Sequence, residues 1–211
     1  MNWFITGTST GVGKTYATCL LLRSLREAGV RAVGYKPVCS GGREDAEALR
    51  QAGEPGPSLD EINPVHFKAA LSPYAAALIE NRPLAWAALV DGYRALAADY
   101  PAVLVEGAGG WQVPLCPGKT IADLAADLAL PVLIVADNRL GALNHTILTA
   151  RAIEAAGLRC AGIVLNHTEE ERDAASISNA AILSEFVDRP VIEIMHGQDA
   201  IYDDLSVFGA G

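Results

Sequence analysis

Short, continuous apolar runs recur along the chain, and longer segments with helical spacing separate them. The runs are rich in valine and isoleucine and do not alternate with polar residues, which is typical of strands buried on both faces of a parallel sheet. We therefore predict an α/β fold, with a doubly wound, mostly parallel sheet flanked by helices and joined by right-handed crossovers. The predicted strands are Asn2–Thr6, Ala32–Tyr35, Ala102–Val105, Val132–Ala136, Gly162–Leu165 and Val191–Met195. The predicted helices are Lys14–Ala28, Pro83–Asp99, Ala122–Ala129, Ala142–Ala156 and Asp173–Val187.

Glycines and one irregular segment punctuate this pattern. Gly29 and Gly157 follow predicted helices directly, where a glycine commonly ends a helix in a left-handed conformation. Gly41–Pro64 contains glycines, prolines and charges, and we expect a loop with one short helix near Asp45–Ala52. An insert of this length inside a compact domain is usually functional or mobile. Without internal repeats or an interdomain linker, the pattern predicts a single domain over residues 1–211.

The charge balance narrows the function classes. Sixteen Lys and Arg residues against 25 Asp and Glu residues give a formal net charge of −9. Such a chain lacks the basic surface that nucleic acids or anionic membranes attract. No apolar run approaches the ~20 residues that span a bilayer, and no secretory signal is visible, so we expect a cytoplasmic protein. Its four scattered cysteines contain no Cys-x-x-Cys pair and are expected to be reduced thiols.

The first predicted strand leads into a phosphate-binding motif. Residues 7–15 read GTSTGVGKT, and a helical pattern follows at once. Strand, glycine-containing loop, Lys-Thr and helix form the P-loop arrangement, in which backbone N–H groups cradle phosphates. Lys14 would reach the β- and γ-phosphates, and the Thr15 hydroxyl would ligate Mg²⁺. The strict P-loop pattern has glycine where this chain has Thr8, and here the glycine lies one position earlier, at Gly7.

Acidic residues supply candidates for further magnesium ligands. Glu106 and Asp137 each end an apolar strand run, where a carboxylate would lie at the carboxyl edge of the sheet beside the P-loop. Strand position alone does not choose between these two. Asp45 in the insert is another candidate, although an acid near the start of a helix is equally explained by the helix dipole.

Lys36 ends the second strand run and precedes a proline. The residue before proline is held extended, which aims its side chain. A lysine at the carboxyl end of a buried strand faces the ligand edge of an α/β sheet, so Lys36 is a candidate catalytic residue. The alternative is a lysine that extends from the sheet edge to reach solvent.

Together these segments resemble the dethiobiotin synthetase family of biotin biosynthesis, almost from end to end. The glycine spacing at Gly7 is the form that this family uses. After the last strand the family usually has Gly-Glu-Ile-Pro, where this chain reads Ile192-Glu193-Ile194-Met195-His196. The segments that carry the resemblance are Thr6–Thr15, Tyr35–Val38 with Ser40-Gly41, Leu71-Ser72-Pro73, Val103–Trp111 with Pro114-Leu115, and Leu140-Gly141 with Asn144-His145.

The resemblance implies an ATP-dependent ligase that converts 7,8-diaminopelargonic acid and CO₂ to dethiobiotin with Mg²⁺. It implies Lys36 and Lys14 as catalytic residues, and a homodimer in which the segment from Gly141 to Asn144 serves the neighbouring subunit. The implied ATP contacts are Gly11, Val12, Gly13, Lys14, Thr15, Tyr16, Asp45, Glu106, Gly107, Ala108, Gly109 and Asn166, the last reading adenine. The implied metal ligands are Thr15, Asp45 and Glu106, and the implied substrate contacts are Thr10, Lys36, Ser40, Gly141 and Asn144.

Two other classes share this nucleotide-binding pattern. Partition- and septum-type regulatory ATPases typically carry a lysine two residues before the position of Gly11, where this chain has Ser9. Amidoligases of the cobyric-acid type usually carry an appended glutaminase domain, for which 211 residues leave no room. The regulatory ATPase therefore stands as the alternative to the ligase.

Overall fold

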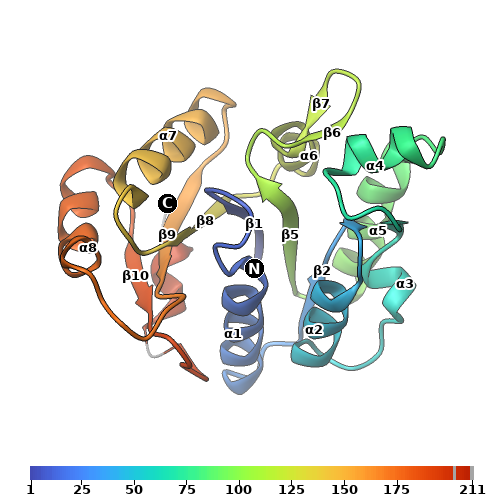
Figure 1. Ribbon diagram of the computed structural model, residues 1–211. Coiled ribbons are helices and arrows are strands. Elements are labelled where there is room, and N and C mark those ends of the chain that lie inside the picture. Colours follow the sequence, from blue (N-terminus) through green and yellow to red (C-terminus); the bar gives the residue numbers. More distant parts are fainter. Residues whose placement is uncertain (202, 210–211) are drawn as a thin grey trace.

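A central parallel sheet organises the computed structural model, which describes residues 1–201 and 203–209 (Figure 1). Within these residues, six strands lie in the order β10-β9-β8-β1-β5-β2, and every neighbouring pair is parallel. This arrangement confirms the predicted α/β fold. The strands are β1 (Asn2–Gly7), β2 (Ala32–Tyr35), β5 (Ala102–Gly110), β8 (Val132–Asp137), β9 (Cys160–Asn166) and β10 (Val191–Ile194).

Helices cover both faces of the sheet, so each strand is apolar on both sides. In β1, Trp3 and Ile5 belong to one apolar core, whereas Phe4 between them belongs to the other. Alternate side chains of a strand point to opposite faces, and this division follows that geometry. The first core includes α1 (Lys14–Glu27) and α2 (Glu44–Ala52). The second includes α5 (Trp86–Asp99), α6 (Ile121–Leu128), α7 (Ala142–Ala155) and α8 (Ala174–Phe186).

The helix ends follow the sequence signals closely, with one exception. Gly29 and Gly157 adopt φ of +80° and +74°, and their N–H groups donate to carbonyls of the preceding helical turn, as predicted. The predicted helix Pro83–Asp99 begins only at Trp86. The residues before it lie outside any helix, and Leu84 among them is buried in the core.

The insert is more ordered than predicted. The short helix is present as α2, but a second helix, α3 (Leu59–Ile62), follows it. Ser58 and Glu61 form a reciprocal capping box at its start. The insert is bracketed by a parallel ladder of β3 (Val38–Ser40) and β4 (Val65–Phe67), which lies outside the central sheet.

Smaller elements complete the fold. They are α4 (Pro73–Ile79), the hairpin of β6 (Pro114–Cys116) and β7 (Lys119–Thr120), and a 3₁₀ helix, Leu205–Phe208, near the carboxyl terminus. In the part of the chain that the structure describes, no helix combines the length and apolar character needed to cross a membrane.

Candidate active site

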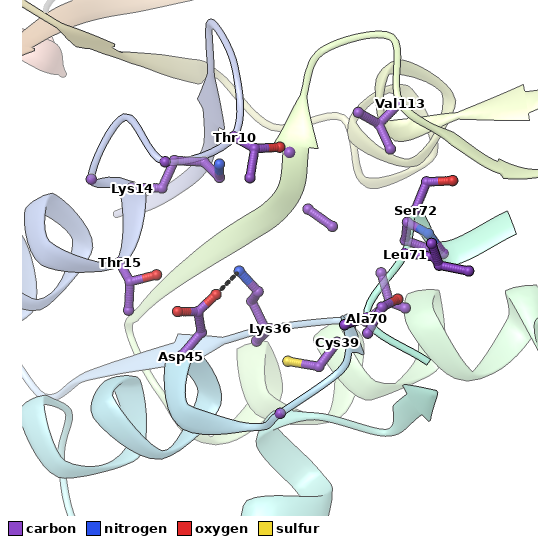
Figure 2. A pocket seen from close by; sticks show the side chains of 18 residues that line it. Thr10, Lys14, Thr15, Lys36, Cys39, Asp45, Ala70, Leu71, Ser72 and Val113 are labelled. Atoms are coloured by element: carbon purple, nitrogen blue, oxygen red, sulfur yellow. Dashed lines mark hydrogen bonds and ion pairs between the residues drawn. The ribbon is translucent and has the colours of Figure 1, made fainter. Parts of the chain in front are cut away.

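A cavity of about 680 Å³ opens beside the carboxyl ends of β1, β2 and β5. The P-loop forms one wall, and the segment Ala70–Pro73, which leads into α4, forms much of the opposite wall (Figure 2). Lys36 and Asp45 project between the two walls. The lining residues are Thr10, Gly11, Gly13, Lys14, Thr15, Lys36, Val38, Cys39, Ser40, Gly42, Asp45, Ala70, Leu71, Ser72, Pro73, Ala108, Gly109 and Val113.

The P-loop connects β1 to α1 through a tight turn that requires glycine. A Cβ on Gly7 would lie 2.8 Å from the backbone oxygen of Ser9 and 2.9 Å from a methyl carbon of Val12. Gly13 directly precedes α1 with φ of 84°, a left-handed conformation that favours glycine. The displaced glycine at Gly7 therefore has a steric reason in this chain.

Lys14 extends from the start of α1 along the P-loop wall. Its side chain is buried, and its Nζ donates to the carbonyl of Ser9 at 3.4 Å. Burial, together with the nearby positive charge of Lys36, lowers the pKa of Lys14 to about 8. An anion placed beside this ammonium group would therefore be attracted by a charge that has few other partners.

Lys36 lies on the floor of the cavity at the carboxyl end of β2, only 4% exposed. Its Nζ donates to Glu106 Oε1 at 2.5 Å, to Asp45 Oδ2 at 3.0 Å and to the carbonyl of Gly107 at 3.4 Å. Burial alone would lower the pKa of Lys36, but the two carboxylates raise it above its usual value, so the side chain carries its charge at neutral pH. It does not extend to solvent as the alternative interpretation required.

Thr15, Asp45 and Glu106 surround Lys36 with oxygen atoms. The Thr15 hydroxyl donates to Glu106 Oε1 at 2.8 Å, and Glu106 is fully buried with Oε2 lacking a hydrogen-bond partner. Asp45 is half-exposed; burial would raise its pKa, but Lys36 holds it below the usual value. Hydroxyl and carboxylate oxygens are the ligands that Mg²⁺ prefers, and an unsatisfied carboxylate oxygen can accept one more cationic partner. The residues present therefore fit a magnesium ion.

Asp137, the rival of Glu106 in the sequence, lies elsewhere. It accepts a hydrogen bond from Thr168 at 2.7 Å and pairs with Arg139 at 2.9 Å. These residues line a second cavity of about 240 Å³, built from the loops after β8 and β9. The tertiary structure therefore distinguishes Glu106, which contacts Lys36, from Asp137, which does not line the same cavity. Strand position alone could not make this choice.

Several predicted site residues do not line the large cavity. Asn166, at the end of β9, donates from Nδ2 to the carbonyl of Val12 at 3.1 Å, and its Oδ1 is buried without a partner. The Tyr16 hydroxyl donates to the carbonyl of Gln198. Gly141 and Asn144 lie exposed at the start of α7. Glu106 and Gly107 lie beneath the cavity floor, in contact with Lys36.

The opposite wall contains residues for which the sequence analysis predicted no role. Leu71, Ser72 and Pro73 belong to a segment that carries the family resemblance, and that was the signal available. Val113 gave no signal of its own. Cys39 is one of the four cysteines, and burial raises the pKa of its thiol to about 11, so it is not a thiolate at neutral pH.

The segment after the last strand also differs from the usual family pattern. Met195–Gln198 forms a turn in which Gly197 has φ of 70°. The N–H of Gln198 donates to the carbonyl of Met195 at 3.1 Å, while the N–H of Met195 donates to Gln198 Oε1 at 2.8 Å. The turn begins at Met195, where the family resemblance implies a proline.

Comparisons with known proteins agree with this geometry. The family model described as an AAA domain matches residues 2–196. The septum site-determining protein MinD from Pyrococcus horikoshii, solved with Mg-ADP, aligns with a TM-score of 0.57 and 16% identity over 92% of this chain and 82% of that one. Chloroplast FtsY from Physcomitrella patens aligns with a TM-score of 0.58 and 17% identity, over 99% of this chain and 63% of that one. Identities this low show the fold alone, and fold and site together define a P-loop nucleotide-binding protein.

Curated relatives specify the family. The ATP-dependent dethiobiotin synthetase of Akkermansia muciniphila is 49% identical over 98% of this chain and 96% of the relative. The dethiobiotin synthetase of Anaeromyxobacter sp. (strain K) is 50% identical over 91% of this chain and 88% of the relative. The chain belongs to the ATP-dependent dethiobiotin synthetase family and is an enzyme of the ligase class. The septum-type ATPase MinD, at 16% identity, supports the regulatory ATPase alternative by its fold alone.

Proposed function

We propose that this enzyme carboxylates 7,8-diaminopelargonic acid with CO₂ and closes the ring to give dethiobiotin, using ATP. One amine attacks CO₂, loses a proton and becomes a carbamate. A carbamate oxygen attacks the γ-phosphate, releasing ADP and leaving a carbamic–phosphoric anhydride. The second amine attacks the carbonyl carbon, the C–O bond to phosphate breaks, and phosphate and a proton leave as the cyclic urea forms. The products are dethiobiotin, ADP and phosphate.

The observation that carries this proposal is the position of Lys36 in the cavity. Its buried ammonium group lies between the P-loop wall and the wall formed by residues 70–73. A carbamate and a triphosphate are both anionic and repel each other, so they meet only where positive charge is concentrated. Lys14 and Lys36 line the same cavity and supply that charge, and phosphoryl transfer depends mainly on such positioning and charge stabilisation.

Thr15, Asp45 and Glu106 are the residues proposed to hold Mg²⁺. The buried, unpartnered Oε2 of Glu106 supports this assignment, because a buried carboxylate oxygen normally has a partner. When bound, the ion neutralises phosphate charge during transfer. Gly11, Gly13 and Lys14 face the phosphates in this proposal, and Asn166 faces the base.

Thr10 and Ser40 line the cavity and are proposed to contact the diamine substrate. Gly141 and Asn144 lie outside it, at the exposed start of α7. Because the family resemblance implies it, we propose that they serve the site of a second subunit in a homodimer. Leu140 and Leu148 beside them are 83% and 57% exposed, apolar surface that pairing would cover. The proposed location of this dimer is the cytoplasm.

The test is an incubation of the enzyme with ATP, MgCl₂, bicarbonate and 7,8-diaminopelargonic acid, with dethiobiotin followed by mass spectrometry. We expect one ADP for each dethiobiotin formed. Omitting the diamine should stop ADP production, which separates a coupled ligase from an ATPase. ATP hydrolysis that is independent of the diamine, with no dethiobiotin, would contradict the proposal.

Replacing Lys36 tests the residue on which the mechanism depends. In Lys36→Ala we expect dethiobiotin formation to fall by on the order of 10²–10³ or more, because one well-placed charge is lost. ATP affinity should change little, since the P-loop is intact. Turnover by mass spectrometry and ATP binding by calorimetry check the two parts, with exposed Lys68→Ala as the control. Near-normal turnover in Lys36→Ala would refute the role.

A further inference from the structure

The ammonium group of Lys36 stands between the same carboxylates that are proposed to hold the metal ion. Glu106 Oε1 lies 2.5 Å from Lys36 Nζ, and Asp45 Oδ2 lies 3.0 Å from it. The Thr15 hydroxyl contacts the same Oε1 atom of Glu106. Two of the three proposed ligands are therefore paired with an existing cation, and the third contacts one of those two. Glu106 Oε2 has no partner, but a divalent ion can take Glu106 Oε1 and Asp45 Oδ2 only if Lys36 releases them.

The charges around Lys36 already balance. Lys14 and Lys36 contribute two positive charges, and Asp45 and Glu106 contribute two negative ones. Among residues 1–201 and 203–209, no group of three or more His, Cys, Asp or Glu side chains is placed to hold a metal ion. A free divalent cation would thus meet a neutralised and incomplete set of ligands, and displacing a buried lysine from a buried carboxylate is costly.

Nucleotide phosphates change this balance. They bring several negative charges to the P-loop wall, which the Lys36 side chain also faces across the cavity. An ammonium group on a flexible four-carbon stem can move from the carboxylates to those phosphates. Glu106 and Asp45 are then left with uncompensated charge, which a divalent ion can neutralise.

We propose that Lys36 acts as an internal cation that excludes free divalent metal ions until nucleotide binds. The metal then enters with the phosphates, and Lys36 turns to the reacting anions as the metal takes its carboxylate partners. Lys36 thereby sets the order of binding as well as contributing charge. This inference rests on the proposed metal ligands Thr15, Asp45 and Glu106.

The experiment measures Mn²⁺ binding to the nucleotide-free enzyme by electron paramagnetic resonance. Wild type should show only weak binding, whereas Lys36→Met should bind Mn²⁺ more tightly by on the order of tenfold or more, because one positive charge has gone. Methionine keeps an unbranched apolar stem of similar length. Lys68→Met, which removes an exposed charge, should bind as wild type does.

A double variant locates the binding. Lys36→Met combined with Glu106→Gln should lose the gained Mn²⁺ affinity. Lys36→Met should also have a lower Tm than wild type, since Glu106 loses its ion-pair partner, and MnCl₂ without nucleotide should restore it. If Lys36→Met folds poorly, Lys36→Gln replaces it in the same Mn²⁺ measurements. Glutamine is uncharged but can still donate a hydrogen bond to Glu106.

The outcomes separate this inference from the proposed function. Equal Mn²⁺ affinity of wild type and the Lys36 variants without nucleotide would overturn the inference, even if the wild type makes dethiobiotin. A gain in affinity that survives Glu106→Gln would also overturn it, because the ion would then bind elsewhere. A gain that Glu106→Gln removes supports it, whatever product the enzyme makes.

Discussion

At the scale of single residues, the role of an acid depends on contacts that the local sequence does not contain. Glu106 and Asp137 each follow an apolar run in the sequence, which could not rank them. The contact that distinguishes Glu106 joins it to Lys36, 70 residues earlier in the chain. Asp137 is instead satisfied by Arg139 and Thr168 near its own strand end. The candidate residues were predictable, and their choice required the tertiary structure.

Glu106→Gln tests this distinction. Glutamine keeps the shape of the side chain but removes its charge, so the Mg²⁺ concentration for half-maximal turnover should rise by roughly tenfold or more. Asp137→Asn, at the other strand end, should leave the Mg²⁺ titration unchanged. Initial rates of dethiobiotin formation against MgCl₂ give both values. An unshifted titration in Glu106→Gln would count against its role as a ligand.

At the scale of elements, the P-loop is held from two sides. β1 and α1 form its ends, and Asn166 at the end of β9 binds the carbonyl of Val12. This contact leaves no room for a side chain at Gly13, where a Cβ would lie 2.1 Å from Asn166 Nδ2. The loop conformation thus depends on a glycine for two independent reasons, its left-handed φ and the approach of Asn166.

Gly13→Ala should therefore lower stability and ATP affinity more than Gly11→Ala does. Both positions have positive φ, 84° and 79°, so both variants carry backbone strain of about 1–2 kcal/mol. Only Gly13→Ala adds the collision with Asn166, because a Cβ at Gly11 meets nothing within 4 Å. We expect a lower Tm and a larger loss of ATP affinity in Gly13→Ala, measured by calorimetry. Equal effects of the two variants would show that the Asn166 contact is unimportant.

The elements themselves divide into those that the pattern of residues predicts and those that it does not. The six apolar strands and most long helices follow from apolar runs and helical spacing. The ladder of β3 and β4 has three residues in each strand, too few to show a periodicity. Helix α3 is equally short, but its Ser58 and Glu61 capping box is a sequence signal that identifies its start.

At the scale of the whole molecule, the carboxyl-terminal segment closes one face of the sheet. Phe208 is fully buried, and its ring lies edge-on to that of Trp3 in β1, with centroids 5.8 Å apart. A Cβ on Gly162 in β9 would lie 2.4 Å from the same ring. Residues from both ends of the chain therefore share one core.

Phe208→Ala should destabilise the protein by about 3–5 kcal/mol, since it leaves a cavity between Trp3 and Gly162. Val207→Ala removes a neighbouring side chain that is 38% exposed and should have a much smaller effect. Urea unfolding of the two variants and wild type measures the difference. A loss below about 1 kcal/mol in Phe208→Ala would mean that the segment adds little to the core.

The cavity shows where prediction from the sequence ends. The P-loop wall was predictable, because its motif is continuous in the chain. The opposite wall is assembled from segments that are distant in sequence, and among its residues only Ser40 had an implied role. They are Val38, Cys39, Ser40, Gly42, residues 70–73 and Val113. Their convergence depends on packing that no local pattern records.

The opposite wall is built largely from residues 38–73, a stretch that adds no strand to the central sheet. Changes to its lining residues other than Asp45, such as Ser40 and Leu71, would leave the P-loop and the strands of the central sheet in place. A site divided in this way would let the acceptor side change while the phosphate side is kept.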